Sequence, residues 1–331
     1  MAVPNDIILY HYTFSPYARR ITWYLALRGI DYAQCLQPPV IPRPDVNALG
    51  INYRRIPLMS IGRDVYCDTR IILQKLEQRF PDGALGATQP DQKAIEQLLE
   101  KWCIGGGVFV RASQLIPPEI PLFADPKFVK DRAEFTGRSW DLETVKKNRP
   151  EAIAEFRTFF DFLETGFLAD GREWILKTEK PSLADIEAVW PFHWLLGLKG
   201  ALPQDLFSPQ EYPKVFAWIG RFNKAVEAAK KSGPKPTTLK GPEATKHIVQ
   251  AQFVDKTISV DETDPLGLKA GQEVEVWPTD SGFKNRDRGG LVALTSQEVV
   301  IATKRQDGGN EIRLHHPRTG FRIQAVGGSK L

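Results

Sequence analysis

Apolar and polar positions follow three different patterns along this chain of 331 residues, and each pattern predicts a different kind of domain. In the first 85 residues, short apolar runs alternate with amphipathic segments. The pattern predicts strands at 7–10, 31–36, 58–61 and 65–67 and helices at 16–28 and 69–80. Short strands that alternate with helices are typical of α/β domains, so we expect residues 1–85 to form one.

From about residue 90 the apolar positions recur with the spacing of a helix. Five of them fall at i, i+3, i+4, i+7 and i+8 and so share one helix face: Ile95, Leu98, Leu99, Trp102 and Cys103. Further apolar stripes occur at 153–167 and 215–226, and another helix is expected to begin near Ser182. We therefore predict an all-helical domain over residues 90–232, after a linker rich in glycine, proline and alanine.

Beyond residue 246 the period falls to two. Residues 274–277, 299–302 and 312–314 alternate, and glycines separate these runs. The pattern predicts a small all-β module over residues 246–331, which we interpret as an SH3-like or OB-like barrel. Residues 230–246 contain three prolines among lysines and threonines, and we expect them to form a second linker.

Composition narrows the class of protein further. A hydrophobic content of 42% with 25% charged residues is typical of a globular protein, and a net charge of +4 gives no reason to expect nucleic acid as a partner. The three cysteines, Cys35, Cys67 and Cys103, are far apart and form no Cys-x-x-Cys pair. We therefore predict buried reduced thiols, and neither a disulfide framework nor a zinc site. The adjacent His315 and His316 show no metal-ligand spacing, so no metal is expected.

The sequence also bears on location. The first residues lack the basic segment and apolar run of a secretory signal. No stretch approaches the roughly 18–20 apolar residues that span a bilayer. We expect a soluble, cytoplasmic protein without a membrane partner.

The residues that could carry chemistry lie in the α/β domain. Ser15 is placed to cap the first helix, with Pro16 at its first position. Ile56-Pro57 precedes the pair of strands, and Asp68-Thr69 opens the next helix. In this order and spacing, these motifs resemble the glutathione-binding thioredoxin-like domain of the glutathione transferase superfamily.

The resemblance extends beyond these motifs. The Ser-Pro-Tyr turn at Ser15 is most similar to the Cys-Pro-Phe turn of omega-class enzymes, with serine in place of cysteine. Ser182-Leu183-Ala184-Asp185 resembles the capping box of a helix in the second domain of this family. Together with the extra β module, the chain looks like a group of fungal transferase-like proteins. The implied architecture is a thioredoxin-like α/β domain, an all-α domain and a small all-β barrel-like module.

The resemblance implies a set of glutathione contacts. Ile56, before a cis Pro57, would pair through its backbone with the cysteinyl part of glutathione. Thr69 would bind the γ-glutamyl carboxylate at a helix N-terminus, and Asp68 would face the ammonium group. Arg55 would meet the glycyl carboxylate, with Arg54 as its competitor. The residues by themselves leave simpler readings open: an ordinary proline, helix caps at Asp68 or Thr69, and a solvated arginine.

Ser15 is the candidate catalytic residue. A free thiol has a pKa near about 8.5, so a hydroxyl that donates a hydrogen bond to sulfur would increase the thiolate fraction of glutathione. Tyr12 and Tyr17 are alternative hydroxyl donors, and a plain N-cap is the alternative role for Ser15.

The resemblance implies a glutathione-dependent transferase or isomerase. Its second substrate would be a hydrophobic electrophilic small molecule held between the domains. The alternative is a non-catalytic glutathione-binding or protein-interaction scaffold, with the β module recruiting a partner. A homodimer is compatible with the sequence, which does not decide between it and a monomer.

Overall fold

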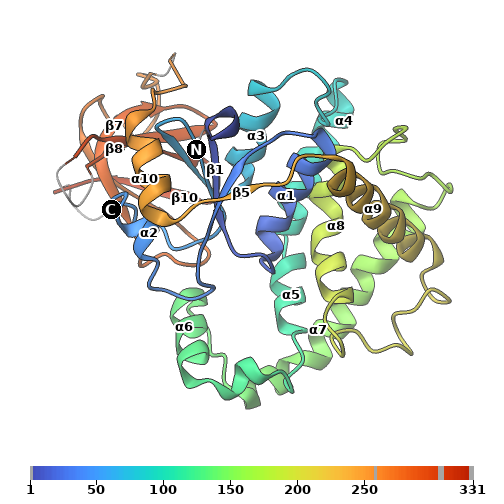
Figure 1. Cartoon of the computed structure of the whole chain (residues 1–331). Coiled ribbons are helices and arrows are strands. Elements are labelled where there is room, and N and C mark those ends of the chain that lie inside the picture. Colours follow the sequence, from blue (N-terminus) through green and yellow to red (C-terminus); the bar gives the residue numbers. More distant parts are fainter. Residues whose placement is uncertain (1–2, 257–258, 305–308, 328–331) are drawn as a thin grey trace.

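The computed structural model of the chain describes residues 3–256, 259–304 and 309–327. One sheet of ten strands runs through the N-terminal and C-terminal parts, in the order β10-β6-β7-β8-β9-β4-β3-β1-β2-β5 (Figure 1). The helices of the middle of the chain form a separate layer at one side of this sheet (Figure 1).

The N-terminal domain has the predicted thioredoxin-like architecture. Its strand β1 (Ile7–His11) pairs in parallel with β2 (Ala33–Leu36) and antiparallel with β3 (Leu58–Ile61). Strand β3 pairs antiparallel with β4 (Asp64–Cys67). Its helices are the 3-10 turn η1 (Pro4–Asp6), α1 (Pro16–Arg28), α2 (Pro44–Asn47) and α3 (Thr69–Arg79). Gly29 ends α1 in the left-handed conformation, with φ +62°, which a residue without Cβ adopts readily.

The helical domain is also present as predicted. It consists of α4 (Pro90–Ile104), α5 (Val108–Gln114), η2 (Pro121–Ala124), α6 (Pro126–Thr136), α7 (Leu142–Phe162), the π-helical turn η3 (Leu163–Phe167), α8 (Leu183–Leu196) and α9 (Pro213–Ser232). The capping box at the start of α8 forms, because the Asp185 carboxylate accepts from the Ser182 backbone N–H at 2.9 Å. Asp185 also accepts from the indole of Trp218 at 2.9 Å, which ties α8 to α9.

The β module consists of β6 (Glu273–Pro278), β7 (Asp287–Leu294), β8 (Glu298–Thr303), β9 (Ile312–Pro317) and β10 (Phe321–Ala325). Four strands form a meander and β10 returns to pair with β6, so the strands follow the order β10-β6-β7-β8-β9. The module is not detached. Strand β9 pairs in parallel with β4, which brings Asp64 opposite Arg313 and Tyr66 opposite His315. The pairing covers β4, which would otherwise be an exposed edge strand.

Residues 230–246, which we expected to be a linker, are ordered as regular elements in part. The two-residue strand β5 (Thr237–Thr238) adds to β2, and α10 (Gly241–Gln250) follows at once. Pro242 is compatible with this structure because it lies in the first turn of α10, where a missing N–H costs little. Figure 1 shows α10 between α2 and the strands of the β module.

Two other expectations concern burial and membranes. Cys35, Cys67 and Cys103 are free and buried, as predicted. Among the helices of the described residues, none combines the length and apolar character that crossing a bilayer requires.

Candidate functional site

The strand register brings the three predicted motifs to one end of the sheet. Leu58, the first residue of β3, lies opposite Tyr10 near the end of β1 and opposite Cys67 at the end of β4. The chain therefore enters β3 from Ile56-Pro57 at the same end at which it leaves β1 toward Ser15 and leaves β4 toward Asp68-Thr69. Motifs that are 40 residues apart in sequence thus become neighbours.

Ser15 caps α1, and its hydroxyl remains able to donate a hydrogen bond to a ligand. Its side chain is 1% exposed, and its Oγ accepts a hydrogen bond from the Ala18 backbone N–H at 3.2 Å. Among the described residues, no acceptor lies within hydrogen-bond reach of the Ser15 hydroxyl proton, and the backbone N–H of Tyr17 also has no acceptor. A hydroxyl and an N–H at a helix N-terminus are donors suited to an anion.

Ile56 presents unpaired backbone groups beside this turn. The Ile56–Pro57 peptide bond is cis, as expected from the sequence. Within the described ranges, neither the N–H nor the C=O of Ile56 makes a hydrogen bond. An extended peptide could therefore pair with Ile56 as a further strand would.

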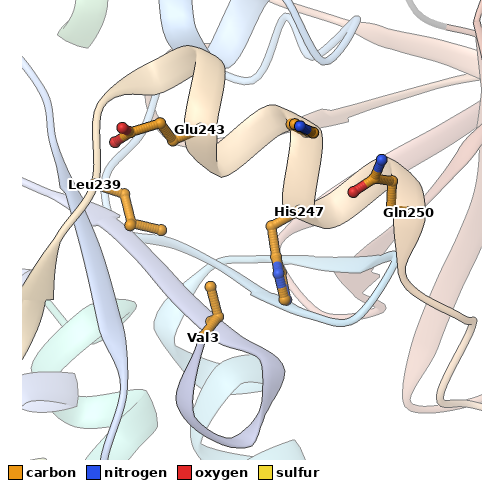
Figure 2. Close-up of a pocket in the computed structure, with 6 residues that line it drawn as sticks. Val3, Leu239, Glu243, His247 and Gln250 are labelled. Atoms are coloured by element: carbon orange, nitrogen blue, oxygen red, sulfur yellow. The ribbon is translucent and has the colours of Figure 1, made fainter. Parts of the chain in front are cut away.

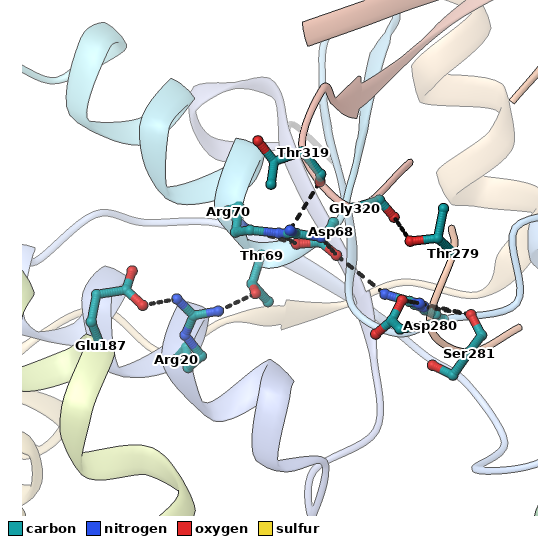
Figure 3. Close-up of polar contacts among 11 residues, drawn as sticks. Arg20, Asp68, Thr69, Arg70, Glu187, Thr279, Asp280, Ser281, Thr319 and Gly320 are labelled. Carbon is teal, nitrogen blue, oxygen red and sulfur yellow. Dashed lines mark hydrogen bonds and ion pairs between the residues drawn. The ribbon is translucent and has the colours of Figure 1, made fainter. Parts of the chain in front are cut away.

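Asp68 and Thr69 form the N-terminus of α3. Asp68 has φ +89° and caps the helix, because its Oδ1 accepts from the Arg70 backbone N–H at 3.1 Å. The backbone N–H of Thr69 has no acceptor in the part of the chain that the structure describes. The Thr69 hydroxyl accepts from the buried Arg20, whose guanidinium also pairs with Glu187 on α8 (Figure 3). Arg20 thus joins the candidate site to the helical domain.

The Asp68 carboxylate is already surrounded by cations. The Arg70 Nε lies 2.9 Å from Oδ1 and an Arg70 terminal nitrogen lies 3.0 Å from Oδ2, while Arg55 approaches Oδ2 at 3.6 Å. Burial alone would raise the pKa of Asp68, but the guanidinium of Arg70, with a smaller effect of Arg55, lowers it to about 2. With both of its oxygens engaged by Arg70 and Arg55, the Asp68 carboxylate is a poor partner for a ligand ammonium group, whereas the two guanidinium groups can bind a ligand carboxylate.

Arg55 and Arg70 are held by the β module. The Arg55 guanidinium donates to the Ser281 carbonyl at 2.7 Å and pairs with Asp280, both in the connection between β6 and β7. Arg70 donates to the Thr319 carbonyl at 3.0 Å, in the turn between β9 and β10. Two connections of the β module therefore cover the end of the site that holds Arg55 and Arg70, an arrangement that the sequence did not indicate.

The remaining sequence candidates have structural partners. Arg54 pairs with Asp131 of α6 at 2.7 Å and lies over the ring of Phe135. The Tyr17 ring packs 4.7 Å from the rings of both Phe109 and Trp190, and burial raises the pKa of its phenol. Tyr12 packs against Phe14, with ring centroids 4.7 Å apart.

Glu100 on α4 is a candidate that sequence reasoning missed. Burial raises the pKa of its carboxyl, although the nearby guanidinium groups of Arg20 and Arg70 favour the charged form. It forms no hydrogen bond or ion pair among the described residues. Glu100 lies one helical turn after the buried Glu96 on α4. Two acidic residues at this spacing on an otherwise apolar helix face could have indicated the site from the sequence.

A separate cavity of about 320 Å³ lies between η1 and α10, lined by Val3, Leu239, Glu243, Lys246, His247 and Gln250 (Figure 2). Two of its polar side chains have partners: Glu243 accepts from the Lys240 backbone N–H at 2.9 Å, and His247 lies 3.2 Å from Asp6. It is distinct from the site at the ends of β1, β3 and β4.

Comparison with known families agrees with this geometry. Residues 9–86 match the family described as "Glutathione S-transferase, N-terminal domain". Residues 111–231 match a family described as a domain of unknown function (DUF7962). No curated protein matched the chain.

Solved structures share the fold. A GST-like protein from Pseudomonas syringae has a TM-score of 0.68 and 22% identity, over 97% of this chain and 100% of its own. A beta-etherase from Sphingobium sp. strain SYK-6 has a TM-score of 0.52 and 16% identity, over 69% of this chain and 100% of its own. A Tau class glutathione S-transferase from mango, Mangifera indica, has a TM-score of 0.51 and 14% identity, over 73% of this chain and 96% of its own. The first likeness spans nearly the whole chain, β module included.

Proposed function

Because residues 9–86 match the glutathione S-transferase N-terminal domain family, we propose that the protein binds glutathione and activates the thiol for attack on a hydrophobic electrophile. The observation that carries the proposal is the set of unpaired backbone groups at one end of the sheet. These are the N–H groups of Tyr17, Ile56 and Thr69 and the C=O of Ile56, with no partner among the described residues.

Each group has a counterpart in a γ-glutamyl tripeptide. The cysteinyl residue pairs with the N–H and C=O of Ile56. The γ-glutamyl carboxylate lies at the N-terminus of α3, against Thr69, with Arg55 and Arg70 at its side. Asp68 orients these two arginines, and Glu100 is the free carboxylate available to the γ-glutamyl ammonium group. The assignment moves Arg55 from the glycyl end, where the sequence placed it, toward the γ-glutamyl end.

The thiol then lies beside Ser15. It loses its proton to solvent, and the thiolate accepts hydrogen bonds from the Ser15 hydroxyl and the Tyr17 N–H at the positive end of α1. In transfer, sulfur forms a bond to the electrophilic carbon, and the leaving group departs with the electron pair. In isomerisation, the thiolate adds, a bond of the adduct rotates, and the same thiolate leaves.

The aromatic rings between the domains suit an apolar acceptor. The rings of Tyr17, Phe109 and Trp190 pack with centroids 4.7 to 4.8 Å apart. Tyr17 lies two residues after Ser15, so this aromatic group is next to the candidate catalytic residue. Free buried thiols and a dependence on reduced glutathione both fit the cytoplasm as the place of action.

Calorimetric titration with glutathione tests the proposal. Two independent anchors, Ile56 and the Thr69 helix terminus, are expected to give a dissociation constant between about 1 μM and 1 mM. Difference absorption of the bound thiolate then tests activation. Binding without a thiolate band would favour the non-catalytic glutathione-binding scaffold, and absence of binding would refute the transferase and leave only the protein-interaction scaffold.

Thr69→Val is expected to weaken glutathione binding by roughly fivefold to tenfold. Valine removes the hydroxyl but keeps the backbone N–H, so the loss is partial. Calorimetry measures the change. Thr22→Val is the matched control, because the Thr22 hydroxyl donates only to the Arg19 carbonyl within α1. Equal affinities of Thr69→Val and the parent would exclude the carboxylate assignment.

Asp280→Asn is expected to strengthen glutathione binding by roughly twofold to fivefold. The Asp280 carboxylate, 58% exposed, pairs with Arg55 and so competes with a ligand carboxylate for the same guanidinium. Glu275→Gln, in the exposed pair with Arg286, is the control and should leave the affinity unchanged. Weaker binding by Asp280→Asn would mean that this pair organises the site and does not compete with the ligand.

A further inference from the structure

Three buried side chains of metal-binding type meet where the β module joins the N-terminal domain. They are Cys67 at the end of β4, Asp287 at the start of β7 and His316 on β9, with exposed fractions of 0%, 1% and 0%. Their candidate ligand atoms all lie within 4.8 Å of one another. The residues come from positions 67, 287 and 316, so the folded sheet alone brings them together.

Three polar atoms of this cluster lack hydrogen-bond partners among the described residues. Asp287 Oδ1 accepts from the backbone N–H groups of Asn52, at 2.7 Å, and Tyr53, at 3.1 Å, which fixes the orientation of the carboxylate. Its Oδ2 and both ring nitrogens of His316 are buried and have no hydrogen-bond partner among the described residues. Because buried polar groups without partners destabilise a fold, such a cluster calls for a ligand.

The opposite face of the sheet provides an internal comparison. His315, the neighbour of His316 on β9, faces Asp64 at 2.9 Å, with Asp255 and Glu298 nearby. There the Lys75 ammonium supplies the cation, at 2.6 Å from Asp255 and 2.9 Å from Glu298. No lysine or arginine of the described ranges pairs with Asp287. The cluster around His316 therefore lacks the cation that the cluster around His315 has.

We propose that Cys67, Asp287 and His316 bind one zinc ion that fastens the β module to the N-terminal domain. Thiolate, imidazole and carboxylate are the ligand types that Zn²⁺ takes in proteins. Asp287 Oδ2 and His316 Nε2 are 3.5 Å apart, close to the separation of about 3.4 Å between two tetrahedral ligands at about 2.1 Å from zinc. Three protein ligands leave the fourth usual position to a small ligand such as water.

Neighbouring groups fix the orientation of two of the three ligands. The Asn52 and Tyr53 N–H groups hold the free oxygen of the carboxylate, and the Phe321 ring packs 5.4 Å from the His316 ring. Since the cluster is enclosed, zinc would enter during folding and contribute to the free energy of folding. Its role is independent of glutathione, because none of the three side chains belongs to the proposed glutathione contacts.

Elemental analysis of the full chain tests the proposal. Protein produced in minimal medium with added zinc, then dialysed against a chelating resin, is expected to hold about one zinc per chain. His316→Gln and Asp287→Asn are expected to lower the zinc content at least fivefold. Cys103→Ser is the matched control, because Cys103 is another fully buried free thiol and should leave the content unchanged.

Cobalt substitution is a second test, which can be made on the folded parent protein. Protein produced with Co²⁺ in place of zinc should show the intense visible bands of tetrahedral cobalt and a thiolate-to-cobalt charge-transfer band, and Cys67→Ser should lose the latter. Parent protein that holds no metal, whether purified directly or refolded with zinc, would overturn the proposal. So would zinc that survives His316→Gln but is lost in His315→Gln, because the metal would then belong to the opposite face.

Discussion

Ser15→Ala is expected to slow glutathione-dependent turnover by roughly tenfold to a hundredfold, because one hydrogen bond to a thiolate is worth about 1.5–3 kcal/mol. The Ser15 hydroxyl proton has no acceptor among the described residues, so it is available to the ligand. The same change should raise the pKa of the bound thiol. At low pH, where the thiol is neutral, the affinity for glutathione should barely change.

The measurement is a pH titration of the thiolate band together with the rate. Tyr12→Phe is the informative comparison, since Tyr12 is the other hydroxyl near the turn that is not packed into the helical domain. If Ser15→Ala leaves both the band and the rate unchanged while Tyr12→Phe abolishes them, Tyr12 is the activating group. Loss of activity in Ser15→Ala with an unchanged thiol pKa would also contradict the assigned role.

Arg20→Met is expected to destabilise the fold by about 3–5 kcal/mol, the usual cost of leaving one member of a buried ion pair without its partner. Arg20 is fully buried, donates to Thr69 and pairs with Glu187. Burial raises the pKa of Glu187 to about 7, and the Arg20 guanidinium opposes this rise. Without Arg20 the folded state favours the protonated acid, so the deficit against the parent should shrink as the pH falls from 8 to 6.

Chemical unfolding of the variants checks this result. The double variant Arg20→Met/Glu187→Leu should regain most of the loss, because neither member of the buried pair is left without its partner. Lys230→Met is the control on the helix surface, where the pair with Glu227 is exposed and worth less than about 1 kcal/mol. A double variant as unstable as Arg20→Met would show that the guanidinium acts through packing and not through its charge.

Local sequence patterns predicted the parts of this structure that depend on local physics. The N-cap at Ser15 and the glycine after Arg28 define α1 to the residue. Asp68 begins α3 for the same reason, since the side chain of a cap bonds within its own turn. These positions also carry the proposed glutathione contacts, so the candidate site could be assembled before the fold was known.

What the sequence could not predict depends on pairing between distant strands. Nothing near Arg55 in the sequence indicates that Asp280 and Ser281 hold its guanidinium. The strand β5 has only two residues and lies among prolines, so no periodic signal marks it. The His315-His316 pair shows no metal spacing along the chain because its neighbours come from β4 and β7. Our expectation that the chain has no metal site rested on spacing alone, and the zinc proposal replaces it.

The parallel pairing of β4 with β9 also constrains the order in which this protein can be completed during synthesis. Asp64 and His315, which hydrogen-bond across this pairing, are 251 residues apart. The ribosome must therefore release almost the entire chain before β4 can acquire its neighbour. Until then the nascent N-terminal domain has an open strand that could pair with another chain. The nascent N-terminal domain thus depends on β9, which is synthesised near the end of translation, to cover β4. A messenger RNA truncated before β9 would yield a chain prone to aggregate.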